Sequence, residues 1–370
     1  MEKDDKNLSS DYSLINKNRE SFPVDSLLKK SAKWLDASGS HSDIVISSRV
    51  RLARNIEGLH FPNRANSRTL AQVLDILRDC YDSIDELKDS IFLNMNTLSE
   101  LDRQFLMERH LVSPHFIKQK KPAGLIIGKD ELISIMINEE DHLRIQSLQS
   151  GLEIEKAWQV IHRIDDALSK NLDYAFSDQF GFLTACPTNT GTGIRISVFI
   201  NLPALAISSQ IDNIIRDIAP SEIAIRGFYG EGTDVLGNFF QISNQITLGR
   251  TEQSIINRIT NIAEQLIAFE QNARKELMQQ NAIIVEDQIA RAVGILKYAQ
   301  VMNSVEVINH LSMLRLGAAL EIVKQINKKD LNELLVLIQP AHLQKLYEQK
   351  LDSNERDNLR IKLIRNRLKL

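Results

Sequence analysis

The chain has 370 residues, and its 45 lysines and arginines against 48 aspartates and glutamates give a formal net charge of −3. This near balance excludes a polybasic nucleic-acid binder as the default class, and the length suggests roughly two to three domains. Its two cysteines, Cys80 and Cys186, are too few for a disulfide framework, which points to a reducing compartment.

The first 22 residues are rich in Asp, Lys, Asn and Ser and show little apolar periodicity, so we predict a flexible tail over 1–22. The chain is charged from its second residue and lacks the apolar core of a secretory signal. The longest apolar run, 196–207, is interrupted by polar residues and is shorter than the ~20 residues of a spanning helix. We therefore expect a cytoplasmic protein without a membrane span.

An amphipathic pattern over 24–35 predicts one short helix before the Ser-Gly-Ser break at 38–40. From Ile44 the period changes to two, which predicts a strand that runs on to Arg54. Residues two apart share a strand face, so Arg49 and Arg51 should project together.

The next elements build a mixed, largely antiparallel sheet with helices packed on it. We predict helices over 68–88, 97–109 and 153–171, a β-hairpin over 125–137 with its turn at 128–131, and strands over 182–185, 194–201 and 222–226. From Thr251 onward only two of the 15 glycines and one of the eight prolines occur, which predicts an all-helical second domain.

Several polar residues near the strand ends are weak evidence one at a time. Arginines near strand ends usually form a solvated face. The acidic cluster 139–141 is by default interpreted as a polar turn. Cys186, before Pro187, is by default interpreted as a buried structural cysteine. The segment 191–193 fits neither a Walker A loop nor a Rossmann fingerprint. Cys80 lies in a predicted helix, and we interpret it only as a structural cysteine.

The combination of these residues is stronger evidence. Arginines recur near the predicted strand ends, at Arg49, Arg51, Arg144, Arg195 and Arg226. A nest of guanidinium groups is costly unless an anion fills it, and a polyphosphate suits their bidentate donors. The same segments carry two glutamates, whose carboxylates would match a planar cationic co-substrate such as a guanidinium.

Four segments, in order and spacing, resemble the phosphagen (guanidino) kinase family. They are Ser-Ser-Arg-Val-Arg (47–51), Asn-Glu-Glu-Asp-His-Leu-Arg (138–144), Cys-Pro-Thr-Asn-Thr-Gly-Thr-Gly-Ile-Arg (186–195) and Arg-Gly-Phe-Tyr-Gly-Glu (226–231). The variants at 49–55 and 236–249 are similar to those of the bacterial protein arginine kinases within this family. The resemblance runs from about Val24 to the C-terminus.

The resemblance implies an α+β fold: a guanidino-kinase (glutamine-synthetase-like) catalytic domain over 23–255, then a helical domain over 256–370 for dimerisation and phosphoarginine sensing. The implied activity is ATP-dependent phosphorylation of arginine side chains in proteins by direct in-line transfer, as a mark for degradation in the stress response. Mg²⁺ would be held mainly by the phosphates and water, so no protein metal site is expected.

Residue roles follow from the motif positions. The resemblance implies that ATP is contacted by Ser47, Arg49, Arg51, His110, Arg144, Arg195 and Arg226. Glu140 and Glu231 would hold the substrate guanidinium and act as the base, with Cys186 as a thiolate beside it. For His110, a surface position at a helix end is an equally open interpretation.

In the C-terminal region, Arg356, Asp357 and Arg360 resemble the RDxxR segment that forms a phosphoarginine-binding regulatory pocket in protein arginine kinases. On its own, such an Arg/Asp-rich helix start is usually a solvated face. Two positions depart from the family pattern: Phe199 stands where a histidine usually lies against the adenine, and Ile361 stands where a small residue usually follows the RDxxR segment.

Two alternatives remain open from the sequence. One is a kinase of a small guanidino compound, although such kinases carry a sizeable helical domain before the first arginine motif and this chain has one short predicted helix there. The other is a catalytically weak module that binds phosphoarginine. The partners implied by the resemblance are protein substrates with exposed arginines, a second copy of the chain, an activator (McsA), the ClpC/ClpP protease and a heat-shock repressor, with no membrane and no direct nucleic acid.

Overall fold

The protein is described by a computed structural model over residues 23–218, 222–227 and 236–370. The predicted tail, 1–22, lies outside the described residues. An eight-stranded sheet in the order β2-β3-β4-β5-β1-β8-β10-β9 forms the centre of the fold, and all its pairings are antiparallel. The predicted α+β class with a largely antiparallel sheet is confirmed.

The strands of the large sheet are β1 (Val45–Arg54), β2 (Ile91–Asn94), β3 (Gly124–Ile127), β4 (Ile133–Ile137), β5 (Leu143–Ser150), β8 (Ile194–Asn201), β9 (Ile223–Arg226) and β10 (Phe239–Asn244). Two short strands, β6 (Phe176–Ser177) and β7 (Gly181–Phe182), form a separate hairpin. The predicted hairpin over 125–137 is confirmed as β3 and β4.

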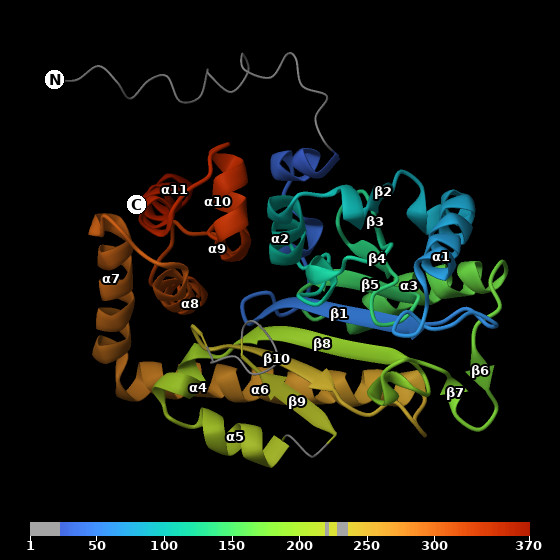
Figure 1. The fold of residues 1–370 in the computed structure, drawn as a ribbon. Helices are drawn as coiled ribbons and strands as arrows, with labels where there is room; N and C mark the ends of the chain where they lie inside the picture. Colours follow the sequence, from blue (N-terminus) through green and yellow to red (C-terminus); the bar gives the residue numbers. More distant parts are fainter. Residues whose placement is uncertain (1–22, 219–221, 228–235) are drawn as a thin grey trace.

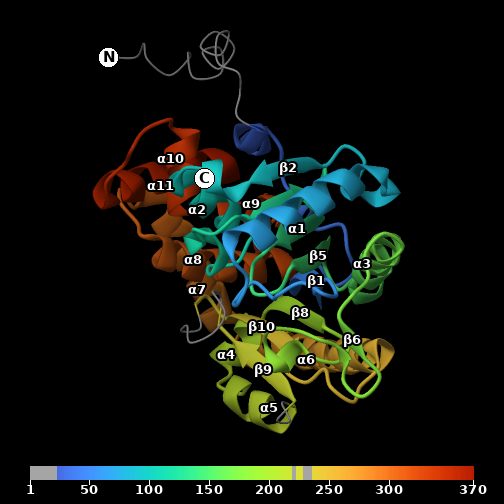
Figure 2. The same cartoon turned by 45° about the vertical axis from the view of Figure 1, so that its right-hand side comes forward.

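The α-helices are α1 (Ser67–Cys80), α2 (Glu100–Glu108), α3 (Ile154–Ser169), α4 (Pro203–Ile207), α5 (Ile211–Ile218), α6 (Glu252–Gln280), α7 (Ala282–Tyr298), α8 (Ser304–Ala319), α9 (Lys328–Leu337), α10 (Pro340–Leu346) and α11 (Ser353–Leu368). Helices α7 to α11 gather beside one end of the sheet in both views (Figures 1 and 2). The predicted helical C-terminal region is confirmed. None of the helices in the described ranges has the length and hydropathy to cross a bilayer.

One face of the sheet is apolar and carries the largest core. Alternate side chains of the central strands, such as Val50 and Leu52 of β1 and Ile196 and Val198 of β8, are fully buried there. They pack against the apolar faces of α1, α3 and α6. Because successive side chains of a strand point to opposite faces, the same strands present their polar residues on the other face.

The predicted single helix over 24–35 is wrong. The structure has two 3₁₀ segments, Pro23–Lys29 and Lys33–Leu35, separated by the extended residue Ala32 with ψ 132°. Val24 and Leu27 pack in a cluster with α2, whereas Trp34 and Leu35 pack in a cluster with α8 and α9. A continuous helix cannot present its apolar side chains to both clusters.

Other boundaries differ because tertiary contacts override the local pattern. The helix predicted over 68–88 ends at Cys80 and continues as two 3₁₀ turns. The strand predicted over 182–185 is limited to Gly181–Phe182. Leu183 N still donates to the Ala175 carbonyl in the register of β6, but Ala185 N donates to the Asp141 carboxylate and leaves the ladder. The sequence did not predict strands for the segments that form β2, β5 and β10.

A buried ion pair joins β1 to α3 at the end of the sheet. The Arg54 guanidinium donates to the Asp165 carboxylate at 2.7 and 3.2 Å and to the Thr192 carbonyl at 2.9 Å, and it lies 3.6 Å from the centre of the Phe182 ring. Gly193 comes so close that a Cβ there would lie 2.6 Å from the Ala53 carbonyl oxygen, and its φ is +68°. This packing anchors the 186–193 loop to the sheet.

We predict that Arg54→Met lowers the free energy of unfolding by about 3–5 kcal/mol, because it leaves the Asp165 carboxylate buried without its partner. Urea unfolding would measure the loss, and Arg54→Met combined with Asp165→Leu should recover part of it. The control is Arg163→Met, whose exposed pair with Glu86 is worth at most about 1 kcal/mol. Equal losses in the two single variants would contradict the prediction.

Candidate functional site

The strand register places the five predicted arginines on the polar face of the sheet. Arg51 of β1 lies opposite Arg195 of β8, Arg144 of β5 lies opposite Ala53, and Arg226 of β9 lies opposite Gln241 of β10. Residues directly opposite each other on paired strands share a face, so this set has the same orientation as Arg49 and Arg51. Arg226 is in register with Phe199, two strands across and four residues along the sheet from Arg195, so strand spacing separates the two by roughly 16 Å. We call this surface the arginine face.

The arginine face concentrates positive charge. Burial, together with Arg144 and Arg195, lowers the pKa of the Arg49 guanidinium to about 9. Burial and the same neighbours, together with Arg49, hold the pKa of Arg51 well below its usual range, and its buried Nε has no hydrogen-bond partner in the described part of the chain. Charges of one sign at such close range favour a polyanion as a ligand.

One carboxylate, that of Glu139, compensates part of this charge. It accepts two hydrogen bonds from Arg144 Nη1 at 2.8 Å and one from the Ser113 hydroxyl. Burial opposes its ionisation, but Arg144 and Ser113 hold its pKa below the usual range. The neighbouring side chain of Glu140 is exposed. The sequence did not show that Glu139 pairs with an arginine whereas Glu140 is exposed, since Glu139 was interpreted as part of a polar turn.

A recess opens at one end of the arginine face. Its lining combines predicted and unpredicted residues: Trp34, Ser47, Arg49, His110, Leu148, Ser197, Phe199 and Gln241. Arg49 donates from Nε to Ser197 Oγ at 3.2 Å and from Nη2 to Gln241 at 3.5 Å. Trp34 and Gln241 were not assigned to the site from the sequence: Trp34 belongs to no motif, and Gln241 lies in the segment 236–249, whose resemblance implied no role for its glutamine.

His110 belongs to this recess and not to an open surface. Its ring contacts Trp34 edge-on with 5.3 Å between centroids, and burial and Arg49 lower its pKa to about 4, so the ring is neutral at pH 7. Phe199, on the same wall, stacks on Phe239 at 5.4 Å. The recess therefore combines aromatic surfaces with polar groups beside the charged cluster.

A buried carboxylate unites two predicted motif segments. Asp141 Oδ1 accepts from Asn55 Nδ2 at 2.7 Å and from the Ala185 amide at 2.6 Å, so the segment that carries Glu140 lies against the one that leads into Cys186. Burial raises the pKa of Asp141 to about 6, and these two hydrogen bonds oppose the rise. The sequence analysis missed Asp141 as a positioning residue.

The other predicted catalytic residues are placed as follows. Cys186 is partly exposed, and its Sγ lies 3.0 Å from the Thr188 hydroxyl. The loop after it is held by Thr247, whose hydroxyl lies 3.0 and 2.7 Å from the carbonyls of Thr188 and Thr190. Glu231 lies outside the described residues.

The three residues of the RDxxR segment lie on α11. Arg360 is 2% exposed and donates to the carbonyls of Ile338 and Met302, both at 2.8 Å, and to the Asp357 carboxylate. Arg356 donates to the Leu351 carbonyl at 2.7 Å. The Arg360 guanidinium is thus bonded beside the ends of α9 and α8, and the Arg356 guanidinium to the turn just before its own helix.

Two family profiles match the chain in sequence. Residues 72–273 match the C-terminal catalytic domain of the ATP:guanido phosphotransferases, and residues 282–370 match the protein-arginine kinase McsB C-terminal domain. A protein-arginine kinase of Pelotomaculum thermopropionicum is 44% identical over 335 residues, which are 90% of this chain and 94% of that protein. One of Shouchella clausii is 42% identical over 350 residues, 94% of this chain and 98% of that protein.

Solved structures with a similar fold are kinases by name. A lombricine kinase superposes with a TM-score of 0.56 and 22% identity over 67% of this chain and 75% of that one. This superposition shows a similarity of fold. A duplicated taurocyamine kinase from Schistosoma mansoni, with transition-state analogue components bound, superposes with a TM-score of 0.55 and 28% identity over 66% of this chain and 35% of that one.

We predict that Arg51→Met raises the melting temperature of the ligand-free protein, because it removes a buried charge repelled by its neighbours. Inorganic tripolyphosphate should raise the melting temperature of the wild type and have less effect on the variant. Thermal unfolding with and without the polyanion measures both effects. Arg54→Met, three residues along the same strand, is the control and lowers the melting temperature; a similar loss in Arg51→Met would contradict the prediction.

We predict a pH-dependent stability effect at Asp141. Its pKa is raised in the folded state, so its contribution to stability is complete below the unfolded pKa near 4 and is lost as the pH rises through about 6. Asp141→Asn keeps an oxygen acceptor and cannot ionise. Its unfolding free energy relative to wild type should therefore rise by about 1–2 kcal/mol between pH 4 and pH 8.

Urea unfolding at several pH values measures the Asp141 effect. Asp141→Leu, which loses the acceptor, should be destabilised at every pH tested. A difference between Asp141→Asn and wild type that stays constant from pH 4 to pH 8 would contradict the assigned titration.

Proposed function

The chain belongs to the ATP:guanido phosphotransferase family as a protein-arginine kinase, and on this premise we propose that its arginine face binds the phosphates of ATP during direct transfer to a substrate guanidinium. The observation that carries the proposal is the concentration of positive charge around Arg49 and Arg51, with partial compensation by Glu139. A triphosphate removes the mutual repulsion of these groups on binding. Its transferring phosphoryl group then gains preorganised donors.

We propose that Mg²⁺ enters as part of the Mg–ATP substrate. Two of the described carboxylates beside the arginine face are engaged, Glu139 by Arg144 and Asp141 by Asn55 and the Ala185 amide. Within the described ranges, no group of three metal-ligating side chains is assembled. This donor set suits an ion that the phosphates and water hold, with the protein supplying guanidinium groups.

The base of the nucleotide would stack at the mouth of the recess that His110 and Phe199 line, because the recess itself, at about 20 Å³, has room for little more than one water. The recess adjoins Arg49, so a base stacked there would leave its phosphates over the arginines of β1, β5 and β8. Phe199 retains the aromatic surface for stacking, and neutral His110 provides one polar edge.

Glu140, Glu231 and Cys186 would act on the substrate guanidinium. A guanidinium has a pKa above 12 and is a poor nucleophile while protonated, so a carboxylate must orient it and accept a proton as the N–P bond forms and the bond to the leaving ADP breaks. The Asp141 contacts support this assignment, because they bring the Glu140 and Cys186 segments together at one edge of the arginine face.

The helical region would contribute dimerisation and phosphoarginine sensing through Arg356, Asp357 and Arg360. Exposed apolar side chains on and beside α7, among them Ile283 and Tyr298, support an interface on this helix. The resemblance extends the proposal to degradation marking, with McsA, ClpC/ClpP and a heat-shock repressor as partners. The alternatives of a small-guanidine kinase or a non-catalytic module are not favoured, because relatives that cover nine tenths of the chain are protein-arginine kinases.

We predict that Glu140→Gln lowers the kcat of protein arginine phosphorylation by about 10²-fold or more and changes the KM for ATP little, because it removes a proton acceptor without touching the phosphate site. The assay incubates the protein with Mg–ATP and a protein substrate, and mass spectrometry under non-acidic conditions quantifies the acid-labile arginine-linked phosphate. Glu231→Ala should show a similar loss.

The matched control for this prediction is Glu155→Gln, an exposed glutamate on α3, which packs on the apolar face of the sheet. It should label substrate at the wild-type rate. Wild-type labelling by Glu140→Gln and Glu231→Ala would overturn the proposed roles of these carboxylates, and absence of arginine-linked phosphate with the wild type would overturn the proposed function.

A further inference from the structure

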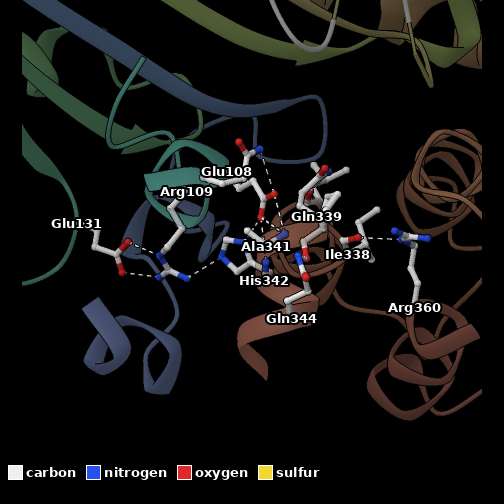
Figure 3. Close-up of polar contacts among 12 residues, drawn as sticks. Glu108, Arg109, Glu131, Ile338, Gln339, Ala341, His342, Gln344 and Arg360 are labelled. Atoms are coloured by element: carbon white, nitrogen blue, oxygen red, sulfur yellow. Dashed lines mark hydrogen bonds and ion pairs between the residues drawn. The ribbon is translucent and has the colours of Figure 1, made fainter. Parts of the chain in front are cut away.

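Three consecutive residues at the end of α2 contact three different parts of the molecule. Glu108 contacts the start of α10 in the helical region, and Arg109 contacts the β3–β4 turn at Glu131 (Figure 3). His110 lines the recess beside Arg49. A displacement of this short segment by the helical region would therefore be transmitted to the recess.

The contact between Glu108 and α10 is dense and buried. The Glu108 carboxylate accepts from the Ala341 amide at 2.9 and 3.1 Å, from the His342 amide at 3.0 Å and from His342 Nδ1 at 2.8 Å (Figure 3). Glu108 is 8% exposed and His342 1%. A carboxylate in this position satisfies the free amides at the start of the helix and fixes the end of α2 against α10.

His342 also contacts Arg109, the residue that follows α2. Its Nδ1 donates to Glu108, which leaves Nε2 as an acceptor 3.5 Å from Arg109 Nη1. Burial lowers the pKa of His342, and a neutral ring fits this pair of roles. Arg109 in turn donates to both oxygens of Glu131, at 2.5 and 2.6 Å, and to the Lys30 carbonyl at 3.2 Å. The imidazole is thus held between two adjacent side chains.

His110 follows in a backbone conformation that depends on its surroundings. Its φ is +60°, a left-handed conformation that costs a residue with a Cβ about 1 kcal/mol or more. Its carbonyl accepts from Gln146 Nε2 at 2.7 Å, and Gln146 lies opposite Arg51 in the sheet. The turn is therefore held on one side by the arginine face and on the other by the helical region.

We propose that His342 is a positioning residue for the nucleotide recess, acting from the helical region through Glu108 and Arg109 on His110. The inference rests on the proposed function in one respect, the assignment of the recess to ATP. The turn before α10 is itself fixed, since the Arg360 guanidinium holds the carbonyl of Ile338 (Figure 3). The helical region thus contributes to ATP affinity without touching the nucleotide.

An ion pair elsewhere in the same interface provides the control. Lys345, on the following turn of α10, bonds to Asp102 near the start of α2 at 2.5 Å and to Asp25 at 2.6 Å. Lys345→Met weakens the contact between α10 and α2 but leaves the bonds to Glu108 and Arg109 in place. Any effect of His342 that reflects only docking of the helical region should appear in this variant too.

The test compares the full-length variants His342→Leu, His342→Asn, His342→Gln and Lys345→Met by steady-state kinetics with Mg–ATP and a protein substrate. His342→Leu should raise the KM for ATP about tenfold with kcat within about twofold of wild type. Asn places its amide where Nδ1 donates to Glu108 and should restore most of the affinity, whereas Gln reaches toward the Nε2 position and should not. Lys345→Met should keep the wild-type KM.

A double-mutant cycle identifies the route. If His342 acts through His110, His342→Leu should add little to the rise in KM caused by His110→Ala. Additive effects, or equal KM values for ATP in His342→Asn, His342→Gln and Lys345→Met, would overturn the inference while leaving the proposed function intact. An unchanged KM for ATP in His110→Ala would instead overturn the assignment of the recess to ATP, and the inference with it.

Discussion

The arrangement of the site depends on the electrostatic repulsion among guanidinium groups on one face of the β-sheet. Arg49 and Arg51 lie in the register of β1 beside arginines of β5 and β8, and each lowers its neighbours' affinity for a proton. A flexible scaffold would let these side chains separate into solvent. The eight-stranded sheet prevents this, because its opposite face is committed to an apolar core with α1, α3 and α6. The repulsion is thereby retained for a ligand to relieve.

Two kinds of arginine occur side by side in this fold. Arg54, Arg109 and Arg274 are buried and bonded to carboxylates of Asp165, Glu131 and Asp43, and they join segments distant in sequence. Among the described residues no carboxylate forms an ion pair with Arg49 or Arg51 of the sheet face, and Glu139 compensates their neighbour Arg144. Paired charges hold the framework together, and the weakly compensated ones supply attraction for phosphate. This division gives the helical region a route to the site, since Arg109 belongs to the first kind and its neighbour His110 lines the recess.

The local sequence pattern was sufficient to predict much of the fold, but it did not predict the boundaries of several helices and strands. Alternation of polar and apolar residues predicted β1, β-branched runs on either side of a polar turn predicted the β3–β4 hairpin, and the scarcity of glycine and proline predicted the helical C-terminal region. The local pattern was wrong for 24–35, where the apolar residues are divided between two clusters, and for 183–185, where the Ala185 amide donates to the Asp141 carboxylate outside the strand ladder. In these places long-range contacts decide the backbone conformation, and no local window contains them.

The sequence by itself determined the residue types of the site and their shared face, because a period of two along β1 orients Arg49 with Arg51 and the motif order identifies their companions. Only the tertiary structure decided which carboxylate compensates the arginines, which one joins the Glu140 and Cys186 segments, and that a histidine of α10 lies against the turn that carries His110. These assignments depend on which segments meet in space. Glu139, Glu140 and Asp141 are adjacent in the chain and chemically alike, and their surroundings alone distinguish them.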